Sequence, residues 1–146
     1  GMGGVFGDAH KNLPKGNQGY FGRASLMQED TAIRRTCLVV KRTLWKAVGG
    51  FDEIFFAESF NDIDLCLKFR DMGYSNVWNP HIELHAQWDP MELDDFEYNR
   101  KNALNIWPIL KQADPYFNPN LSLENHDFLL SWPPRNRLRH DGQVFE

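Results

Sequence analysis

The sequence predicts an α/β fold, because short apolar segments of strand character alternate with segments of helical periodicity. Residues 36–42 are apolar and β-branched, and residues 42–50 change to a helical spacing. The same alternation recurs where a helical pattern at 61–73 is followed by two short strand candidates, at 75–80 and 82–86. The chain has 146 residues, which is the length of one ordinary domain.

Composition and charge limit the classes of function. Hydrophobic residues make up 42% of the chain and aromatic residues 14%, which predicts a folded domain rather than a disordered one. Sixteen Lys and Arg residues stand against 20 Asp and Glu residues, so no broad positive field exists and nucleic acid is not an expected partner. No apolar run approaches the roughly 18 residues that cross a bilayer, so we expect a protein without a transmembrane segment that is cytoplasmic or lies at the cytoplasmic membrane surface.

The two cysteines are predicted to be buried free thiols. Cys37 and Cys66 both lie in apolar stretches, and they lack the C-x-x-C spacing of a zinc or redox site. A reducing compartment agrees with this pattern.

The chain divides into a lead-in, a main segment and a tail. Residues 1–31 contain seven glycines and a proline, which predicts loops with a short strand. Residues 32–130 carry the alternating strands and helices. Residues 131–146 are rich in Pro and Arg and form the predicted tail.

A short helix is predicted at 42–50, directly after the first strand. Leu44, Trp45 and Val48 share one helical face. Gly49 and Gly50 follow, and glycine commonly ends helices in the left-handed conformation.

Two longer helices follow. The first has a predicted core stripe that ends at Gly73 and consists of Leu65, Cys66, Phe69 and Met72. The second, at 88–107, begins with Asp89 as N-cap, and Pro108 is expected to kink it or to end its regular part at Trp107. Its predicted core face consists of Leu93, Phe96, Ala103, Trp107 and Leu110.

Asp62 and Asp64 have two interpretations. Asn61 is a favoured N-cap, and carboxylates in the first turn are stabilised by the helix dipole by about 0.3 to 1 kcal/mol each, so the acids could be structural. Alternatively, they project from a loop-to-helix junction after a double glycine and an aromatic-rich loop, and catalytic groups often lie on such junctions.

Several motifs in order carry a family resemblance. The stretch 36–84, which includes "VGGFDE" and "NDIDLC", resembles the second half of the catalytic domain of family-two nucleotide-sugar glycosyltransferases of the bacterial polysaccharide type. "GYFGR" at 19–23 and "DPYFNPNLS" at 114–122 resemble segments that flank that core in the family. The resemblance covers roughly residues 3 to 130.

The resemblance implies a partial GT-A fold, with a Rossmann-like nucleotide-binding half absent from this chain. It implies an inverting sugar transfer from a nucleotide-sugar donor to a saccharide acceptor, with Asp62 as general base. Asp62-Ile63-Asp64 also fits a metal-binding D-x-D string, but a helix follows it directly, so we interpret it as the base motif. Asp64 is expected to cap the helix or to bind the acceptor. Without the nucleotide-binding half, activity of the chain alone is doubtful.

Further site residues are expected around Asp62. Contacts to acceptor or donor sugar are predicted for Gly49, Gly50, Phe51, Asn61 and Trp88. Arg34 and Arg35 stand where relatives carry small residues and could bind a diphosphate or a charged acceptor. Arg35 in place of a glycine could equally block the site, and a surface or altered-site role is slightly favoured. A divalent metal, Mg or Mn, is expected for the full enzyme, and His85 is a candidate ligand, although a lone His near a strand end is more often structural.

Two other functions remain open. One is a non-catalytic remnant or carbohydrate-binding piece that has kept the fold. The other is a metal-dependent hydrolase that uses Asp62, Asp64 and His85. An apolar surface is expected where the absent half would dock, so self-association is also predicted.

Overall fold

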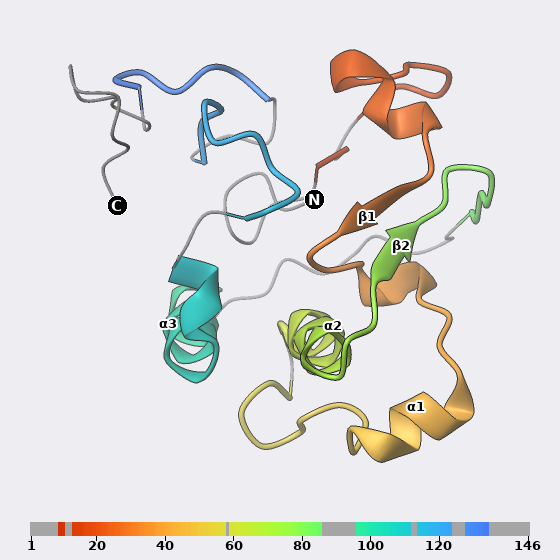
Figure 1. Cartoon of the computed structure of the whole chain (residues 1–146), viewed down its shortest axis with the longest axis vertical. Helices are drawn as coiled ribbons and strands as arrows, with labels where there is room; N and C mark the ends of the chain where they lie inside the picture. Colours follow the sequence, from red (N-terminus) through yellow and green to blue (C-terminus); the bar gives the residue numbers. More distant parts are fainter. Residues whose placement is uncertain are drawn as a thin grey trace.

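The structure is a computed structural model that describes residues 9–10, 13–57, 59–85, 96–111, 114–123 and 128–134. Its elements in chain order are η1 (Tyr20–Ser25), β1 (Gln28–Asp30), η2 (Arg35–Cys37), α1 (Arg42–Ala47), α2 (Asn61–Asp71), β2 (Asn76–Trp78), α3 (Phe96–Ile106) and η3 (Pro108–Lys111). In Figure 1, α2 lies at the centre, between the β1–β2 pair, α1 and α3. Within the described ranges, no helix has the length and apolar character needed to span a membrane.

Helix α2 is buried on most of its surface. Leu65 and Cys66 are 0% exposed and Phe69 is 4% exposed, as the predicted stripe requires. Met72 was predicted to belong to that stripe, but it is 49% exposed, because it lies beyond the last helical residue, in the turn that ends the helix. The main core cluster joins α2 to the loop before it and to α3 and η3: Phe56, Phe60, Ile63, Leu67, Ala103 and Leu110.

The described sheet has two antiparallel strands. β1 pairs with β2 so that Gln28 faces Trp78 and Asp30 faces Asn76. The strand expected within 75–80 and the short strand expected in the lead-in are therefore both present. The Asn76 side-chain amide donates to the carbonyls of Thr31 (2.9 Å) and Cys66 (3.2 Å), so it fastens the sheet to α2.

Two predicted strands are wrong. Residues 36–42 do not form a buried strand: η2 occupies 35–37, and Val39 is 89% exposed. Leu38 does have extended backbone (φ −119°, ψ 123°), but no strand within the described ranges pairs with it, and an apolar run cannot become a buried strand without a neighbour. Residues 82–85 are likewise exposed and outside any strand. The α/β class and the partial GT-A fold stay predictions, since a two-stranded sheet decides neither.

Helix α1 ends as its two glycines predict. Gly49 has φ +81° and Gly50 φ +73°. The N–H of Gly50 donates to the carbonyl of Trp45 (3.0 Å), and that of Gly49 donates to Lys46 (3.3 Å), which is the Schellman pattern. Gly50 is also buried against the Trp45 indole, and a Cβ built there would lie 2.9 Å from the ring.

Helix α3 ends at Ile106, and Pro108 starts the 3₁₀ turn η3, so the predicted interruption is confirmed. On its core face, Ala103 is 1% exposed and Leu110 is 5% exposed, and Trp107 packs partly buried against the core cluster. The predicted N-cap Asp89 lies outside the described residues, as do Leu93 of the predicted core face and the tail beyond 134.

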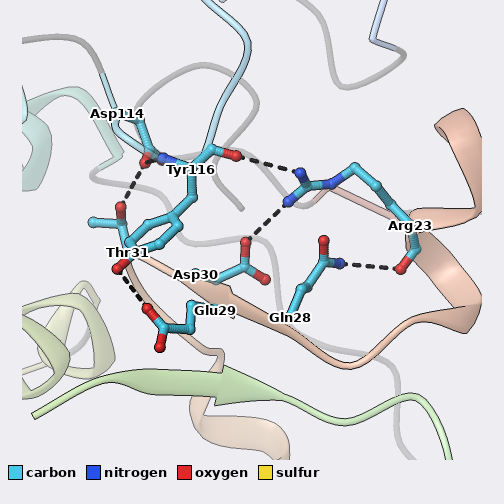
Figure 2. A network of polar contacts seen from close by, with 7 residues as sticks. All are labelled: Arg23, Gln28, Glu29, Asp30, Thr31, Asp114 and Tyr116. Atoms are coloured by element: carbon cyan, nitrogen blue, oxygen red, sulfur yellow. Dashed lines mark hydrogen bonds and ion pairs between the residues drawn. The ribbon is translucent and has the colours of Figure 1, made fainter.

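A polar network ties the lead-in to the segment after η3 (Figure 2). The Arg23 guanidinium donates to the Tyr116 carbonyl (3.3 Å) and to the buried Asp30 carboxylate (3.2 Å). Thr31 Oγ1 donates to Asp114 Oδ1 (2.6 Å), and the Tyr116 hydroxyl donates to Glu29 (2.9 Å). The motifs at 19–23 and 114–122 therefore meet beside β1. The Arg23–Tyr116 contact joins residues more than 90 positions apart.

The two glycines after α1 should differ in their response to alanine. Gly49→Ala meets only the backbone cost of a positive φ, about 1 kcal/mol, because its Cβ site has no atom within 4 Å. Gly50→Ala adds a clash with Trp45, so we expect a loss of about 2 to 4 kcal/mol. Urea denaturation of both variants measures the difference, and equal losses would contradict the close packing of Gly50 under the indole.

Candidate functional site

Asp62 and Asp64 lie on opposite sides of α2. Residues two apart on a helix are separated by about 200° around its axis. Asp64 is 2% exposed and faces the protein interior, whereas Asp62 is half-buried. Packing therefore decides between the two carboxylates, and Asp62 is the one that solvent or a substrate can reach.

The buried Asp64 carboxylate is held by two partners. Trp107 Nε1 donates to Asp64 Oδ1 (2.9 Å), and Lys68 Nζ lies 2.6 Å from Oδ2, one helical turn away. Asp64 does not cap α2, because the N-cap is Phe60 and no side chain caps it. The expected acceptor contact of Asp64 stays a prediction. Its role is to join α2 to the end of α3. The one signal in the sequence for this contact is a tryptophan on a predicted core face, because a buried indole N–H normally has a hydrogen-bond partner.

Asp62 is held by backbone donors. Oδ2 accepts the N–H of Arg35 (3.0 Å), and Oδ1 accepts the N–H of Ile63 (2.9 Å). The first contact spans 27 positions and places the Arg34–Arg35 segment beside the start of α2. Both arginine side chains are exposed. The structure thus brings together the predicted base and the predicted diphosphate-binding residues.

Cys66 holds the segment that carries these arginines. Its Sγ accepts the N–H of Ile33 (3.4 Å) and lies 3.7 Å from the Ile33 carbonyl, to which the thiol donates. Burial raises the pKa of the Cys66 thiol to about 11. The prediction of two buried thiols holds for Cys66 but is wrong for Cys37, which is exposed because residues 36–42 form no buried strand.

The turn before α2 leaves two buried polar atoms without partners. Phe60 takes φ +62°, so Asn61 is already the first helical residue and is not the N-cap that its residue type predicts. Asn61 is 5% exposed and Ser59 is 3% exposed. Within the part of the chain that the structure describes, Asn61 Oδ1 and Ser59 Oγ have no hydrogen-bond partner. Two unused polar groups thus lie next to Asp62, and the predicted sugar contact of Asn61 stays untested.

Gly49, Gly50 and Phe51 are organised by Trp45. The Phe51 ring packs edge-on against the Trp45 indole, with ring centres 4.7 Å apart. The loop then closes on Asp52, whose carboxylate accepts the N–H groups of Phe55 and Ile54 at 2.9 Å each. The hydrogen bond from Phe55 is the main reason why the pKa of Asp52 is lowered. These contacts account for the glycine motif structurally, and a sugar contact there stays a prediction.

A metal centre is not supported by the described residues. Among them, no group of three or more His, Cys, Asp or Glu side chains is placed to hold a metal ion. His85 is exposed, and Asp64 is committed to Trp107 and Lys68. The hydrolase interpretation needs Asp62, Asp64 and His85 around one metal, so this arrangement does not fit it. Trp88, the candidate for stacking on a sugar, lies outside the described residues.

Comparison with known proteins gives two relatives. The chain is 41% identical over 141 residues to the uncharacterized protein y4gI of Sinorhizobium fredii (strain NBRC 101917 / NGR234), covering 91% of the chain and 16% of that protein. It is 26% identical over 132 residues, 87% of the chain, to a protein of Myxococcus xanthus, of which it covers 10%. That protein is the O-antigen biosynthesis protein RfbC. The chain is thus distantly similar to a polysaccharide biosynthesis protein.

The extent of these matches is limited. The chain spans less than a fifth of the length of either relative. No protein-family model matches it, and no solved structure matches it.

Removing the indole donor should destabilise the fold. Trp107→Phe deletes the hydrogen bond to the buried Asp64 carboxylate, which for a charged acceptor is worth about 1.5 to 3 kcal/mol. Trp132→Phe is the matched control, because Trp132 is 90% exposed and its substitution should change stability by less than about 0.5 kcal/mol. Both are measured by urea denaturation. Equal stabilities would show that the indole contributes only bulk.

The two thiols should differ in reactivity. At pH 8, a disulfide reagent such as dithionitrobenzoate should modify Cys37 quickly, and it should modify Cys66 only in denaturant, because the Cys66 thiol is buried and its pKa is about 11. Cys37→Ser should abolish the fast reaction. Rapid modification of that variant without denaturant would contradict the burial of Cys66.

Proposed function

We propose that this chain is the acceptor-side part of an inverting glycosyltransferase that moves a sugar from a nucleotide-sugar donor to a saccharide acceptor, with Asp62 as general base. The observation that carries the proposal is the division of labour between two carboxylates on one helix. Asp64 is buried and bound to Trp107, while Asp62 is held in place by backbone N–H groups and remains accessible. The similarity to an O-antigen biosynthesis protein supports a role in polysaccharide synthesis.

In this proposal the chemistry at Asp62 is a single displacement. The Asp62 carboxylate takes the proton of an acceptor hydroxyl as that oxygen attacks the anomeric carbon of the donor sugar. The bond from that carbon to the nucleoside diphosphate breaks, and the diphosphate leaves with the electron pair, so the configuration inverts. A placed general base contributes typically 10²- to 10⁴-fold to the rate.

The surroundings of Asp62 suit this step. The N–H groups of Arg35 and Ile63 orient the Asp62 carboxylate. The same two hydrogen bonds also agree with the structural interpretation of Asp62, in which the carboxylate organises the start of α2. Arg34 and Arg35 belong to the segment whose backbone binds Asp62, and both are exposed. Their positive charge could stabilise the departing diphosphate. A divalent metal is expected for the full enzyme, but no step is assigned to one, because the described residues offer no cluster of metal ligands.

A non-catalytic saccharide-binding role is the alternative that the short match favours. The chain covers only 16% and 10% of its two relatives, so donor binding could belong to the remainder of such proteins. In that case the chain would bind a saccharide but would not saturate with a nucleotide sugar.

A substitution at Asp62 tests the proposal. UDP-glucose and dTDP-glucose, each with Mg or Mn, are titrated into the chain by calorimetry, and transfer to bacterial O-antigen oligosaccharides is followed by mass spectrometry. Asp62→Asn should leave donor binding unchanged and lower the transfer rate by about 10²- to 10⁴-fold. Asp71→Asn, an exposed carboxylate at the other end of α2, is the control. Undiminished transfer by Asp62→Asn refutes the base, and oligosaccharide binding without transfer by the unchanged chain favours the saccharide-binding alternative.

A further inference from the structure

Aromatic rings from separate segments meet beside η1. Tyr20 stacks almost parallel on Phe128, with ring centres 5.1 Å apart and planes 3° apart. Phe21 packs edge-on against Tyr20 at 4.7 Å. The centre of the His10 ring lies 5.1 Å from the centre of the Trp78 ring and 6.1 Å from that of the Phe128 ring. These five side chains, His10, Tyr20, Phe21, Trp78 and Phe128, are called the aromatic platform below.

The platform is a surface feature rather than a core. Phe21 is 87% exposed, and the other four members are half-buried. One of them, Phe128, packs against Phe117, which is 6% exposed, with ring centres 5.8 Å apart, so the platform is joined to a buried ring. A contiguous group of rings that are partly or fully exposed is typical of an interaction site.

Two of these rings belong to residues with a strained backbone. Phe21 has φ +49° and Phe128 has φ +56°, a region that bulky residues rarely occupy. A glycine would adopt this conformation without strain. The chain nevertheless carries phenylalanine at both positions, and at Phe21 the strained residue gains little burial. Such outliers cluster where a side chain serves a function, so the display of the Phe21 ring requires an explanation other than stability.

The platform stands on a rigid base. Arg23, two residues after Phe21, is fixed by the Asp30 carboxylate and the Tyr116 carbonyl, as Figure 2 shows. Phe117 directly follows Tyr116, and Trp78 is the last residue of β2, opposite Gln28. These contacts order the backbone next to Phe21 and Trp78, and a backbone that is ordered before a ligand binds lowers the entropic cost of binding.

The chemistry of the platform favours a saccharide. Its members combine flat apolar faces with polar edges: the Tyr20 hydroxyl, the His10 imidazole and the Trp78 indole N–H. A pyranose ring has the matching character, with apolar C–H faces and a rim of hydroxyl groups. An acidic chain, with net charge −4, is poorly suited to an anionic lipid surface, and an aliphatic protein partner would not need polar ring edges.

We propose that the aromatic platform binds the saccharide chain of the acceptor, with a pyranose ring stacked on the exposed ring of Phe21. The role of the platform as the acceptor-binding surface of a transferase rests on the proposed function. Saccharide binding at the platform is measured without donor, metal or transfer. It also gives a role to the two flanking motifs, because Tyr20 and Phe21 belong to one and Phe117 belongs to the other.

The test separates binding from stability. The purified chain is applied to an array of bacterial O-antigen oligosaccharides, and affinities of the bound members are measured by calorimetry. Phe21→Gly should weaken binding by about tenfold or more, while its unfolding midpoint should equal or exceed that of the unchanged protein, because glycine relieves the strain at φ +49°. Trp132→Ala, which removes an equally exposed ring outside the platform, should bind normally.

Each outcome decides the proposal. Absence of saccharide binding by the unchanged chain, unchanged affinity of Phe21→Gly, or equal losses in Phe21→Gly and Trp132→Ala would overturn it, as would binding to phosphatidylglycerol vesicles in place of oligosaccharides. The transfer rate of Asp62→Asn distinguishes the two proposals, because it is measured separately from oligosaccharide binding at the platform. If Asp62→Asn transfers sugar at the normal rate while Phe21→Gly does not bind oligosaccharide, saccharide binding at the platform is supported and the assignment of Asp62 as general base is wrong.

Discussion

The hydrogen bond between the Trp107 indole and the buried Asp64 carboxylate is the constraint on which the candidate site depends. A carboxylate with 2% exposure is unfavourable unless it is paired, and here Trp107 and Lys68 supply the partners. Because Asp64 is fixed inward, the helical repeat turns Asp62 away from the core. The same bond fastens the first turns of α2 to the point where Pro108 ends α3, so the orientation of the candidate base depends on a residue far from it in the sequence.

A second set of contacts positions what surrounds Asp62. The segment from Thr31 to Arg35 lies alongside α2. It is held there by the Asn76 amide, the Cys66 thiol and the Asp62 carboxylate. All three contacts involve backbone groups of that segment, and the Thr31 side chain adds its hydrogen bond to Asp114. Arg34 and Arg35 can therefore be exposed at a defined place.

The lead-in and the segment after η3 form the other structured part of the molecule. Polar contacts connect them, and these include the Arg23–Asp30 ion pair and the Thr31–Asp114 hydrogen bond. The Arg70 guanidinium lies 5.0 Å from the centre of the Tyr116 ring, which links this part to α2. The strained phenylalanines of the aromatic platform belong to these segments. The proposed base and the proposed saccharide platform are thus carried by one continuous framework, in a chain that resembles a small part of an O-antigen biosynthesis protein.

The sequence by itself determined the features that depend on local chemistry. Glycines with positive φ end α1 and α2, Pro108 ends α3, and the apolar spacing of α2 places Leu65, Cys66 and Phe69 inside. Only the tertiary structure decided which acid faces outward, that Cys37 is exposed, and that residues 36–42 lack a strand neighbour. The reason is physical: helix ends and turns are set within a few residues, whereas burial, strand pairing and the partner of a charged group depend on segments that meet only in the folded chain.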